Sequence, residues 1–163
     1  KEYLKIFDRL KKNNSKIEFS SDFIIGYPGE NEQDYQNTLE LINKIKFINS
    51  YSFIFSPRPG TVAADFKLIE KKISIKRLEK IQNQLYENQI SMNKSLENKT
   101  INVLVENLTE DKTGVFGRSE YMTSVIFNGS EQDIGKTVPV KIVKSNRSTL
   151  FGELVLNSNQ KVA

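Results

Sequence analysis

The sequence predicts an α/β segment that is joined by a connecting helix to a small, all-β barrel. Two observations predict this fold class. Helical and strand-like apolar patterns alternate through residues 1–92, and five short β segments separated by turn residues fill most of residues 93–157. Residues 158–163 are expected to form a tail. With 163 residues and 37% hydrophobic content, the chain is long enough to bury a core.

The first segment alternates helix and strand. Its first helix, over residues 1–12, is predicted by the helical spacing of Tyr3, Leu4, Ile6, Phe7 and Leu10. A strand follows over residues 17–26, and its apolar run at 23–25 predicts burial on both faces, as in a parallel sheet. Acids near residue 31 begin a second helix, whose apolar face is Tyr35, Leu39, Ile42 and Ile45. A second strand over residues 51–55 completes a βα repeat with parallel pairing.

A long helix and five strands follow. Ser74 is the expected N-cap of a connecting helix whose apolar positions are Ile75, Leu78, Ile81, Leu85, Met92 and Leu96. We place the domain boundary near residue 93. The five β segments cover residues 100–106, 114–121, 124–127, 138–143 and 148–155. Five strands of this length predict a closed or nearly closed barrel.

The residue types that the chain lacks exclude several chemistries. It contains no Cys and no His. This excludes catalytic triads that use a histidine, thiolate or imidazole metal sites, and disulfides. No apolar run approaches the roughly 20 residues of a membrane span, so no membrane partner is expected. Because the chain begins with Lys1 and shows no signal-peptide pattern, we expect a piece of a longer, cytoplasmic protein.

The net charge of +4 conceals a local pattern. The densest basic stretch precedes and enters the predicted connecting helix, at Lys67, Lys71, Lys72, Lys76, Arg77 and Lys80. After residue 134, Glu153 is the only acid among Lys136, Lys141, Lys144, Arg147 and Lys161. Such clusters matter more than the sum of charges when a nucleic-acid partner is considered. For the basic stretch of the helix, the alternative to a nucleic-acid contact is a helix face that is simply exposed to solvent.

Candidate ligand-binding residues lie near the ends of the two predicted strands. In βα folds, ligands bind beyond the carboxyl ends of the strands. Asp22 and the turn 26–30 hold that place in the first strand, and the segment 56–61, with Arg58 between two prolines, follows the second. Each has a plain alternative. For Asp22, the alternative is a cap on a backbone amide. For Gly26, it is a tight turn without a ligand, and for Arg58 it is an exposed loop residue.

The predicted barrel combines basic side chains with an aromatic one. These residues are Arg118, Tyr121, Lys136, Lys141, Lys144 and Arg147. The mixture is typical of surfaces that bind RNA or single strands. An ordinary strand alternation with charged outer positions gives the same pattern, so both interpretations stay open.

Several motifs resemble one known family. The stretch DFIIGYPGE at residues 22–30, followed by Asp34 and Tyr35, and the stretch FSPRPGTVAA at residues 55–64 resemble the late part of a radical S-adenosylmethionine (SAM) barrel. The barrel is that of the MiaB-type tRNA methylthiotransferases, and the helix at 76–93 is similar to the same family. Residues 117–118, 127–129, 135–136 and 152–154 resemble its terminal TRAM domain, a small RNA-binding β-barrel. The resemblance covers nearly the whole chain, in the order of the family.

The resemblance implies a fold, cofactors and partners. It implies a partial radical-SAM (βα) barrel with a connecting helix over residues 1–92 and a small five-stranded, OB-like TRAM barrel over residues 93–157. The implied reaction is 2-methylthiolation of an N6-modified adenosine near the anticodon of tRNA, with SAM and two 4Fe-4S clusters. Positions implied for the SAM pocket are Asp22, Gly26, Ser56 and Arg58. Positions implied for contacts with the tRNA backbone are Arg118, Lys136, Lys144 and Arg147, which would make the affinity salt-dependent.

The chain departs from this family in one respect. The cluster cysteines of the family would lie before Lys1, and the chain has no Cys. We therefore expect that it is inactive alone, that its half barrel exposes an open edge and an apolar face, and that the missing N-terminal part of the enzyme is a partner.

Three points stay open in the sequence. The chain could be a stand-alone TRAM-type RNA-binding protein with a remnant barrel. It could also be a subunit that completes its barrel with a separate, cysteine-bearing chain. Finally, a related branch of the family acts on a ribosomal protein instead of tRNA.

Overall fold

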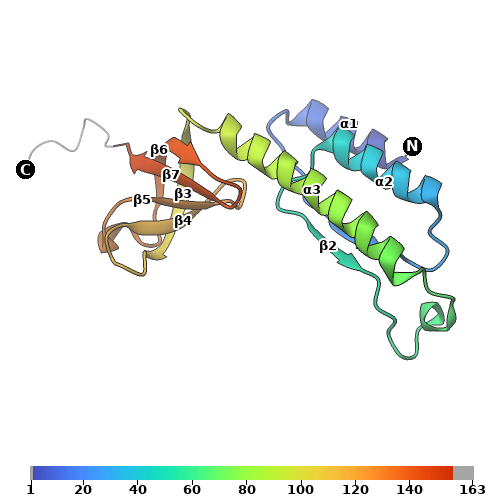
Figure 1. Cartoon of the computed structure of the whole chain (residues 1–163). Helices are drawn as coiled ribbons and strands as arrows, with labels where there is room; N and C mark the ends of the chain where they lie inside the picture. Colours follow the sequence, from blue (N-terminus) through green and yellow to red (C-terminus); the bar gives the residue numbers. More distant parts are fainter. Residues whose placement is uncertain (1, 156–163) are drawn as a thin grey trace, which may run out of the picture. The chain divides into compact units, whose positions relative to one another are not determined.

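The structure is a computed structural model that describes residues 2–155. The chain divides into two compact units between Asn88 and Gln89, and each unit has its own hydrophobic core. Figure 1 shows helices and a short sheet in the first unit and a β-barrel in the second. The predicted order of an α/β part followed by an all-β part is confirmed. The expected tail at 158–163 lies outside the described residues.

The first unit contains two parallel strands with helices packed on them. Its elements are α1 (Glu2–Asn13), β1 (Asp22–Ile25), α2 (Glu32–Ile45), β2 (Tyr51–Ile54), the 3-10 helix η1 (Val62–Asp65) and the first part of α3 (Lys71–Ser95). Strands β1 and β2 pair in parallel, with Ile24 opposite Phe53. Because α2 connects them, these three elements form a βαβ unit, as the alternation of helix and strand predicted.

Helix α2 begins where its sequence predicts, and both of its ends are capped. The N-cap side chain of Asn31 accepts a hydrogen bond from the Asp34 N–H, and the Asp34 carboxylate accepts one from the Asn31 N–H, both at 3.0 Å. At the other end, Lys46 adopts a left-handed conformation and donates its N–H to the Ile42 carbonyl. The predicted apolar face is buried at all four positions, Tyr35, Leu39, Ile42 and Ile45.

Only one face of the two-stranded sheet is covered. Phe23 and Ile25 of β1 pack into a core that includes residues of α2 and α3, and Figure 1 shows helices over the sheet. On the other face, Ile24, Tyr51 and Phe53 are 59%, 66% and 55% exposed. The prediction that β1 is buried on both faces is therefore wrong within this chain, because none of the described residues covers the second face. The expected exposed apolar face is present.

Helix α3 begins earlier than predicted. The Ser74 N–H already donates to the Glu70 carbonyl at 3.1 Å, so Ser74 is a buried residue in the first turn and not the N-cap. Of the predicted apolar positions, Ile81 and Leu85 are buried in the core of the first unit, whereas Ile75 is exposed.

The second unit contains a closed five-stranded barrel, as predicted. Its strands are β3 (Thr100–Leu108), β4 (Val115–Ser119), β5 (Ser124–Asn128), β6 (Thr137–Ser145) and β7 (Thr149–Leu154), and the 3-10 helix η2 (Glu131–Asp133) precedes β6. The strands pair in the order β3-β4-β5-β7-β6, and the pairing of β3 with β6 closes the barrel. Neighbouring strands are antiparallel except for β5 and β7, which are parallel.

The barrel interior follows from alternation along the strands. In β3, Ile101, Val103 and Val105 are buried, and the residues between them are exposed. Gly117 of β4 lies where this strand passes close to β3, and a side chain at this position would overlap the Leu104 carbonyl oxygen. Because β3 also pairs with β6, the backbone N–H and C=O groups along these two strands bond to each other, and the barrel has no open edge there.

Replacement of Ile42 tests the core of the first unit. The Ile42 side chain is 0% exposed, so Ile42→Ala should lower the free energy of unfolding by about 2–5 kcal/mol. The matched change Ile24→Ala, on the exposed face of β1, should alter it by no more than about 0.5 kcal/mol. Urea unfolding followed by far-ultraviolet circular dichroism measures both variants. Equal losses would contradict the assignment of one covered face.

Candidate functional site

The turn after β1 has a conformation that favours glycine. Gly26 has a φ of +74°, in the left-handed region, and a Cβ at this position would lie 2.5 Å from the Ser74 Oγ. The Gly26 N–H donates to Glu30 Oε2 at 2.9 Å, and the Glu30 N–H donates to the Tyr27 carbonyl at 2.9 Å. The turn therefore closes on the Glu30 carboxylate.

Arg77 of α3 binds the same carboxylate. Its Nη1 lies 2.7 Å from Glu30 Oε1, and its Nη2 lies 2.9 Å from Glu32 Oε2. The guanidinium also lies over the Tyr35 ring, 5.1 Å from the ring centroid. Arg77 is only 8% exposed, so this member of the basic stretch is not on a solvated face. Sequence reasoning missed Glu30 and Arg77 as a pair, although an acid directly after the Gly26–Gly29 turn was the available signal.

Hydrogen bonds and burial shift the pKa values of the ionisable groups in this cluster. Hydrogen bonds from Gln36 and Arg77 hold the pKa of Glu32 below its ordinary value. Burial acts to lower the pKa of Arg77, but the hydrogen bonds to Glu32 and Glu30 outweigh burial and raise it. Burial raises the pKa of Tyr35. Arg77 and Glu32 therefore both carry their charge at neutral pH, and an ion pair helps to hold the turn.

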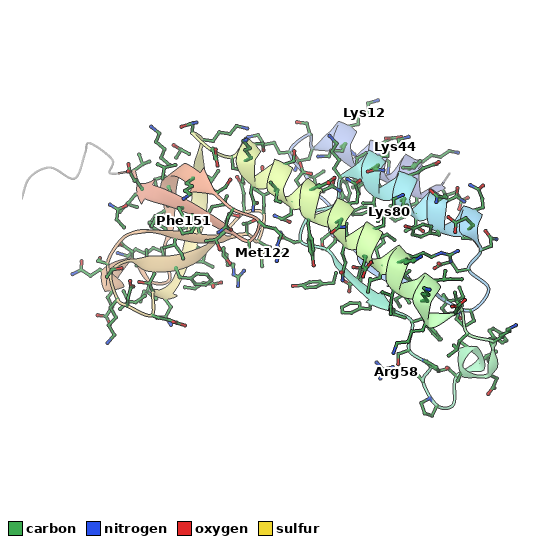
Figure 2. All side chains as sticks on the ribbon, viewed as in Figure 1. Lys12, Lys44, Arg58, Lys80, Met122 and Phe151 are labelled. Carbon is green, nitrogen blue, oxygen red and sulfur yellow. The ribbon has the colours of Figure 1, made fainter. Side chains whose placement is uncertain are left out.

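The other predicted residues of the SAM pocket lie apart from this cluster. Asp22 is the first residue of β1 because the ladder with β2 begins at the Asp22–Tyr51 pair. Its expected place at the carboxyl end of the strand is therefore wrong, and it shares the exposed face with Ile24. Ser56 and Arg58 follow the carboxyl end of β2, as predicted, and both are exposed. Figure 2 labels Arg58 on this loop.

No group of three or more Asp, Glu, His or Cys side chains that could hold a metal ion exists within residues 2–155. Clusters of four irons are held by thiolates, and the chain contains no Cys. The residues present therefore do not fit an iron–sulfur cluster. The described part of the chain also contains no helix with the length and apolar character needed to cross a membrane.

In the barrel, neighbouring groups hold the side chain of Arg118. Its Nη1 donates to Ser124 Oγ at 3.1 Å, and its Nε lies 3.5 Å from Glu106 Oε2. The guanidinium lies over the Phe116 ring, 5.2 Å from the centroid. Arg118 is therefore partly neutralised within the protein, which makes it a weaker candidate for a phosphate contact than its charge alone suggested.

The remaining three basic candidates do not form one cluster. Lys136 lies just before β6, Lys144 lies near the end of β6, and Arg147 lies in the turn between β6 and β7. All three are exposed. At the rise of an extended strand, Lys136 and Lys144 are roughly 25 Å apart along β6. The structure therefore places Lys144 and Arg147 near one end of the strand and Lys136 at the other.

Strand pairing creates a row of apolar side chains beside Lys144. Phe116 of β4 is opposite Ile126 of β5, Ile126 is opposite Phe151 of β7, and Phe151 is opposite Lys144 of β6. Residues opposite each other share one face of a sheet. Leu150, next to Phe151, is fully buried inside the barrel, so this apolar row lies on the outer wall, where it is half-buried. Sequence reasoning missed the row because it depends on pairing between distant strands.

Removal of the Arg77 charge should destabilise the first unit. Arg77→Met leaves the nearly buried Glu30 carboxylate without its partner, and the expected loss in the free energy of unfolding is about 3–5 kcal/mol. The matched control Lys76→Met changes an exposed residue of the same helix and should cost no more than about 0.5 kcal/mol. Urea unfolding measures both, and equal effects would contradict a structural role for Arg77.

Acid should reduce the effect of the same substitution. The hydrogen bond from Gln36 and, next, the one from Arg77 lower the pKa of Glu32 in the folded protein, so the Arg77 bond stabilises the fold above the ordinary pKa of Glu. This contribution is lost as the pH falls through the lowered pKa. The difference in stability between the unsubstituted chain and Arg77→Met should therefore shrink in acid. A difference that stays constant would show that its source is not ionic.

Comparison with known proteins identifies the barrel first. Residues 94–155 match the sequence profile of the TRAM domain. The matched residues include all five strands of the barrel, from β3 to β7. The predicted TRAM barrel is therefore confirmed.

The chain as a whole is similar to part of a longer enzyme. It is 62% identical, over 99% of its length, to 36% of the tRNA-2-methylthio-N(6)-dimethylallyladenosine synthase of Pelagibacter ubique (strain HTCC1062). Proteins of the same description from Wolbachia pipientis wMel and Ehrlichia ruminantium (strain Welgevonden) are 40% and 38% identical, over 93% of this chain and 35% of each protein. The chain thus spans about a third of the length of these relatives. These similarities support the predicted resemblance to a C-terminal fragment of a MiaB-type tRNA methylthiotransferase, with the TRAM domain at residues 94–155.

Proposed function

We propose that this chain supplies the RNA-binding end and part of the cofactor pocket of a radical-SAM tRNA methylthiotransferase. The complete enzyme would add a methylthio group to an N6-modified adenosine near the anticodon of tRNA. One observation carries this proposal: the chain is similar over 99% of its length to a tRNA-2-methylthio-N(6)-dimethylallyladenosine synthase. Because the chain spans 36% of that protein, it would supply only part of the machinery.

We assign the first unit to the late part of a (βα) barrel. Its two strands are parallel, helices cover one face, and the other face exposes Ile24, Tyr51 and Phe53. In a closed (βα) barrel, this second face belongs to the packed interior. The rings of Tyr51 and Phe53 are stacked 6.5 Å apart and offer an apolar surface to a partner. That partner is the N-terminal part of the enzyme, in the same chain or in a separate one.

We place the SAM pocket at the carboxyl ends of β1 and β2. The Gly26 turn and the loop with Ser56 and Arg58 follow these ends, and the guanidinium of Arg58 suits a carboxylate or phosphate. The Gly26 N–H already donates to Glu30 and is not available to a ligand, so Gly26 would contribute to the pocket through the shape of its turn. Asp22 lies at the amino end of β1, so it would face the barrel interior and not this end of the strands. SAM, once bound, would supply the radical for the reaction.

The iron–sulfur clusters would come from the rest of the enzyme. This chain contains no Cys, and thiolates are the ligands of such clusters. The chain alone therefore has no residue with which to hold a 4Fe-4S cluster in the manner of the family. We propose that it is not catalytic without the cysteine-bearing part.

We propose that the barrel, over residues 93–157, binds tRNA through its phosphates. Lys144 and Arg147 offer exposed charge at one end of β6, and Lys136 offers it at the other. Arg118 would contribute less, because Glu106 lies beside it. Contacts of this kind release counterions and weaken as salt rises. A tRNA partner implies that the protein acts in the cytoplasm.

The alternative is a stand-alone TRAM-type RNA-binding protein with a remnant barrel. One observation favours it: the second unit closes around its own core, whereas the first unit leaves one face of its sheet exposed. The two proposals differ when a separately expressed, cysteine-bearing N-terminal part is added under reducing conditions. Methylthiolation of tRNA by the mixture would support the enzyme, and RNA binding without methylthiolation would support the alternative.

Salt-dependent binding of tRNA is the first expected result. When labelled tRNA is titrated with the complete chain, the logarithm of the affinity should fall linearly with the logarithm of the salt concentration. Lys144→Gln should reduce the slope by about one. The matched control Lys112→Gln removes the same charge from the exposed turn between β3 and β4 and should leave the slope unchanged. Absence of binding at low salt, or binding that is insensitive to salt, would contradict the proposal.

Failure to assemble a cluster is the second expected result. Anaerobic incubation of the chain alone with iron and sulfide should give no stoichiometric 4Fe-4S cluster and no SAM cleavage, because no thiolate ligand is present. A ferredoxin with four cysteines, treated in parallel, controls for the reconstitution. Protein-bound iron, visible absorption and SAM cleavage are the measurements. A stoichiometric cluster that cleaves SAM in this chain would refute the proposal.

A further inference from the structure

We propose that the outer wall of β5, β7 and β6 binds a single-stranded segment of RNA, with the Phe151 ring stacked on a base and the Lys144 ammonium at a neighbouring phosphate. This inference rests on the proposed RNA-binding function. It adds to that function the place of contact on the barrel and the kind of RNA that is bound.

The pairing of β6 and β7 places the two required groups side by side. Phe151 and Lys144 are opposite each other in the register, next to a bulge at Val143. Lys144 is exposed, and Leu150, next to Phe151, is buried, so both side chains lie on the outer face. Ile126 lies on the other side of Phe151 and extends the apolar floor. Figure 2 labels Phe151 on β7. An aromatic ring next to a cation is the combination on which bases stack while the backbone is held by charge.

The distribution of charge orients the RNA on this surface. Lys144 is exposed, and in the described part of the chain its ammonium forms no ion pair with a carboxylate. Lys141 lies opposite Glu153, which offsets its charge. At the other end of the apolar row, Glu106, Glu110 and Asp111 line a hollow together with Phe116 and Ile126. Along the apolar row, phosphates are therefore attracted toward Lys144 and repelled from the acidic hollow beside Phe116. Glu97, at the same end of β6 as Lys144, accepts hydrogen bonds from the Ser145 N–H and Oγ.

The same distribution selects Phe151 over Phe116 as the ring that receives the base. The guanidinium of Arg118 already lies over the Phe116 ring, and Glu106 lies beside that guanidinium. Phe151 has Lys144 and Ile126 as its cross-strand neighbours instead. A base can present its face to Phe151 only when it is unpaired and unstacked, so the surface should prefer single strands and loops over duplex RNA.

Substitution of Phe151 tests this inference in the complete chain. The probe is a fluorescein-labelled, single-stranded RNA of about eight nucleotides, within the site size of an OB-type fold. Phe151→Leu keeps apolar bulk but removes the ring, and it should weaken binding about five- to 150-fold without a change in the salt slope. Phe151→Tyr keeps the ring and should bind within about twofold of the unsubstituted chain. Phe116→Leu is the matched control and should also stay within about twofold, because Arg118 already covers that ring.

Two further probes separate stacking from charge. An abasic analogue retains the phosphates and lacks the bases, so it should bind weakly and equally to the unsubstituted chain and to Phe151→Leu. The same RNA annealed to its complement should bind more weakly than the single strand. Thermal melting of each variant identifies any loss of folding. If Phe151→Leu does not fold, the abasic and duplex probes and Phe151→Tyr still decide the question.

Each adverse outcome has a distinct meaning. Normal RNA binding by folded Phe151→Leu, or equal binding of the duplex or abasic probe, overturns the stacking site alone. It leaves the proposed RNA-binding function intact. Absence of binding to both the single strand and tRNA at low salt overturns the proposed RNA-binding function, and this inference with it.

Discussion

The buried ion pair between Arg77 and Glu30 is the contact on which the first unit depends. A nearly buried guanidinium is stable in a protein only when carboxylates pair with it closely, and Arg77 meets two of them at 2.7 and 2.9 Å. Glu30 lies in the turn after β1, and Glu32 lies in the first turn of α2. The pair therefore fixes β1, α2 and α3 against one another. It also explains Gly26, because the turn must close on the same carboxylate beside Ser74 without a side chain.

In the second unit, the structure depends on the closure of the barrel by the pairing of β3 with β6. Because β3 pairs with β6, each strand has a fixed inner and outer face. The inner face holds valines such as Val103 and Val140, which are fully buried. The outer face exposes charged side chains: Glu106, Glu110 and Asp111 at and after the end of β3, and Lys144 on β6. On the outer wall, the acids beside Phe116 and the exposed Lys144 lie at opposite ends of the apolar row.

The two units differ in how complete they are. The barrel pairs its own outer strands and encloses its own core. The two-stranded sheet of the first unit leaves Ile24, Tyr51 and Phe53 exposed, and its charged residue Asp22 lies on the same face. This difference agrees with a chain that spans about a third of its relatives. In the (βα) barrel that we propose, this exposed face would belong to the packed interior.

The sequence by itself predicted α2 and the five barrel strands, because caps, turn residues and apolar periodicity act over a few neighbouring residues. The TRAM assignment came from the resemblance of its motifs to a known family. Helix α2 and all five strands of the barrel lie where those local patterns predicted them. Only the tertiary structure decided which face of β1 is covered and that Arg77 is buried. It also placed Phe151 beside Lys144. The physical reason is that burial and strand pairing depend on residues that are distant in the sequence, and single-sequence patterns do not encode those partners.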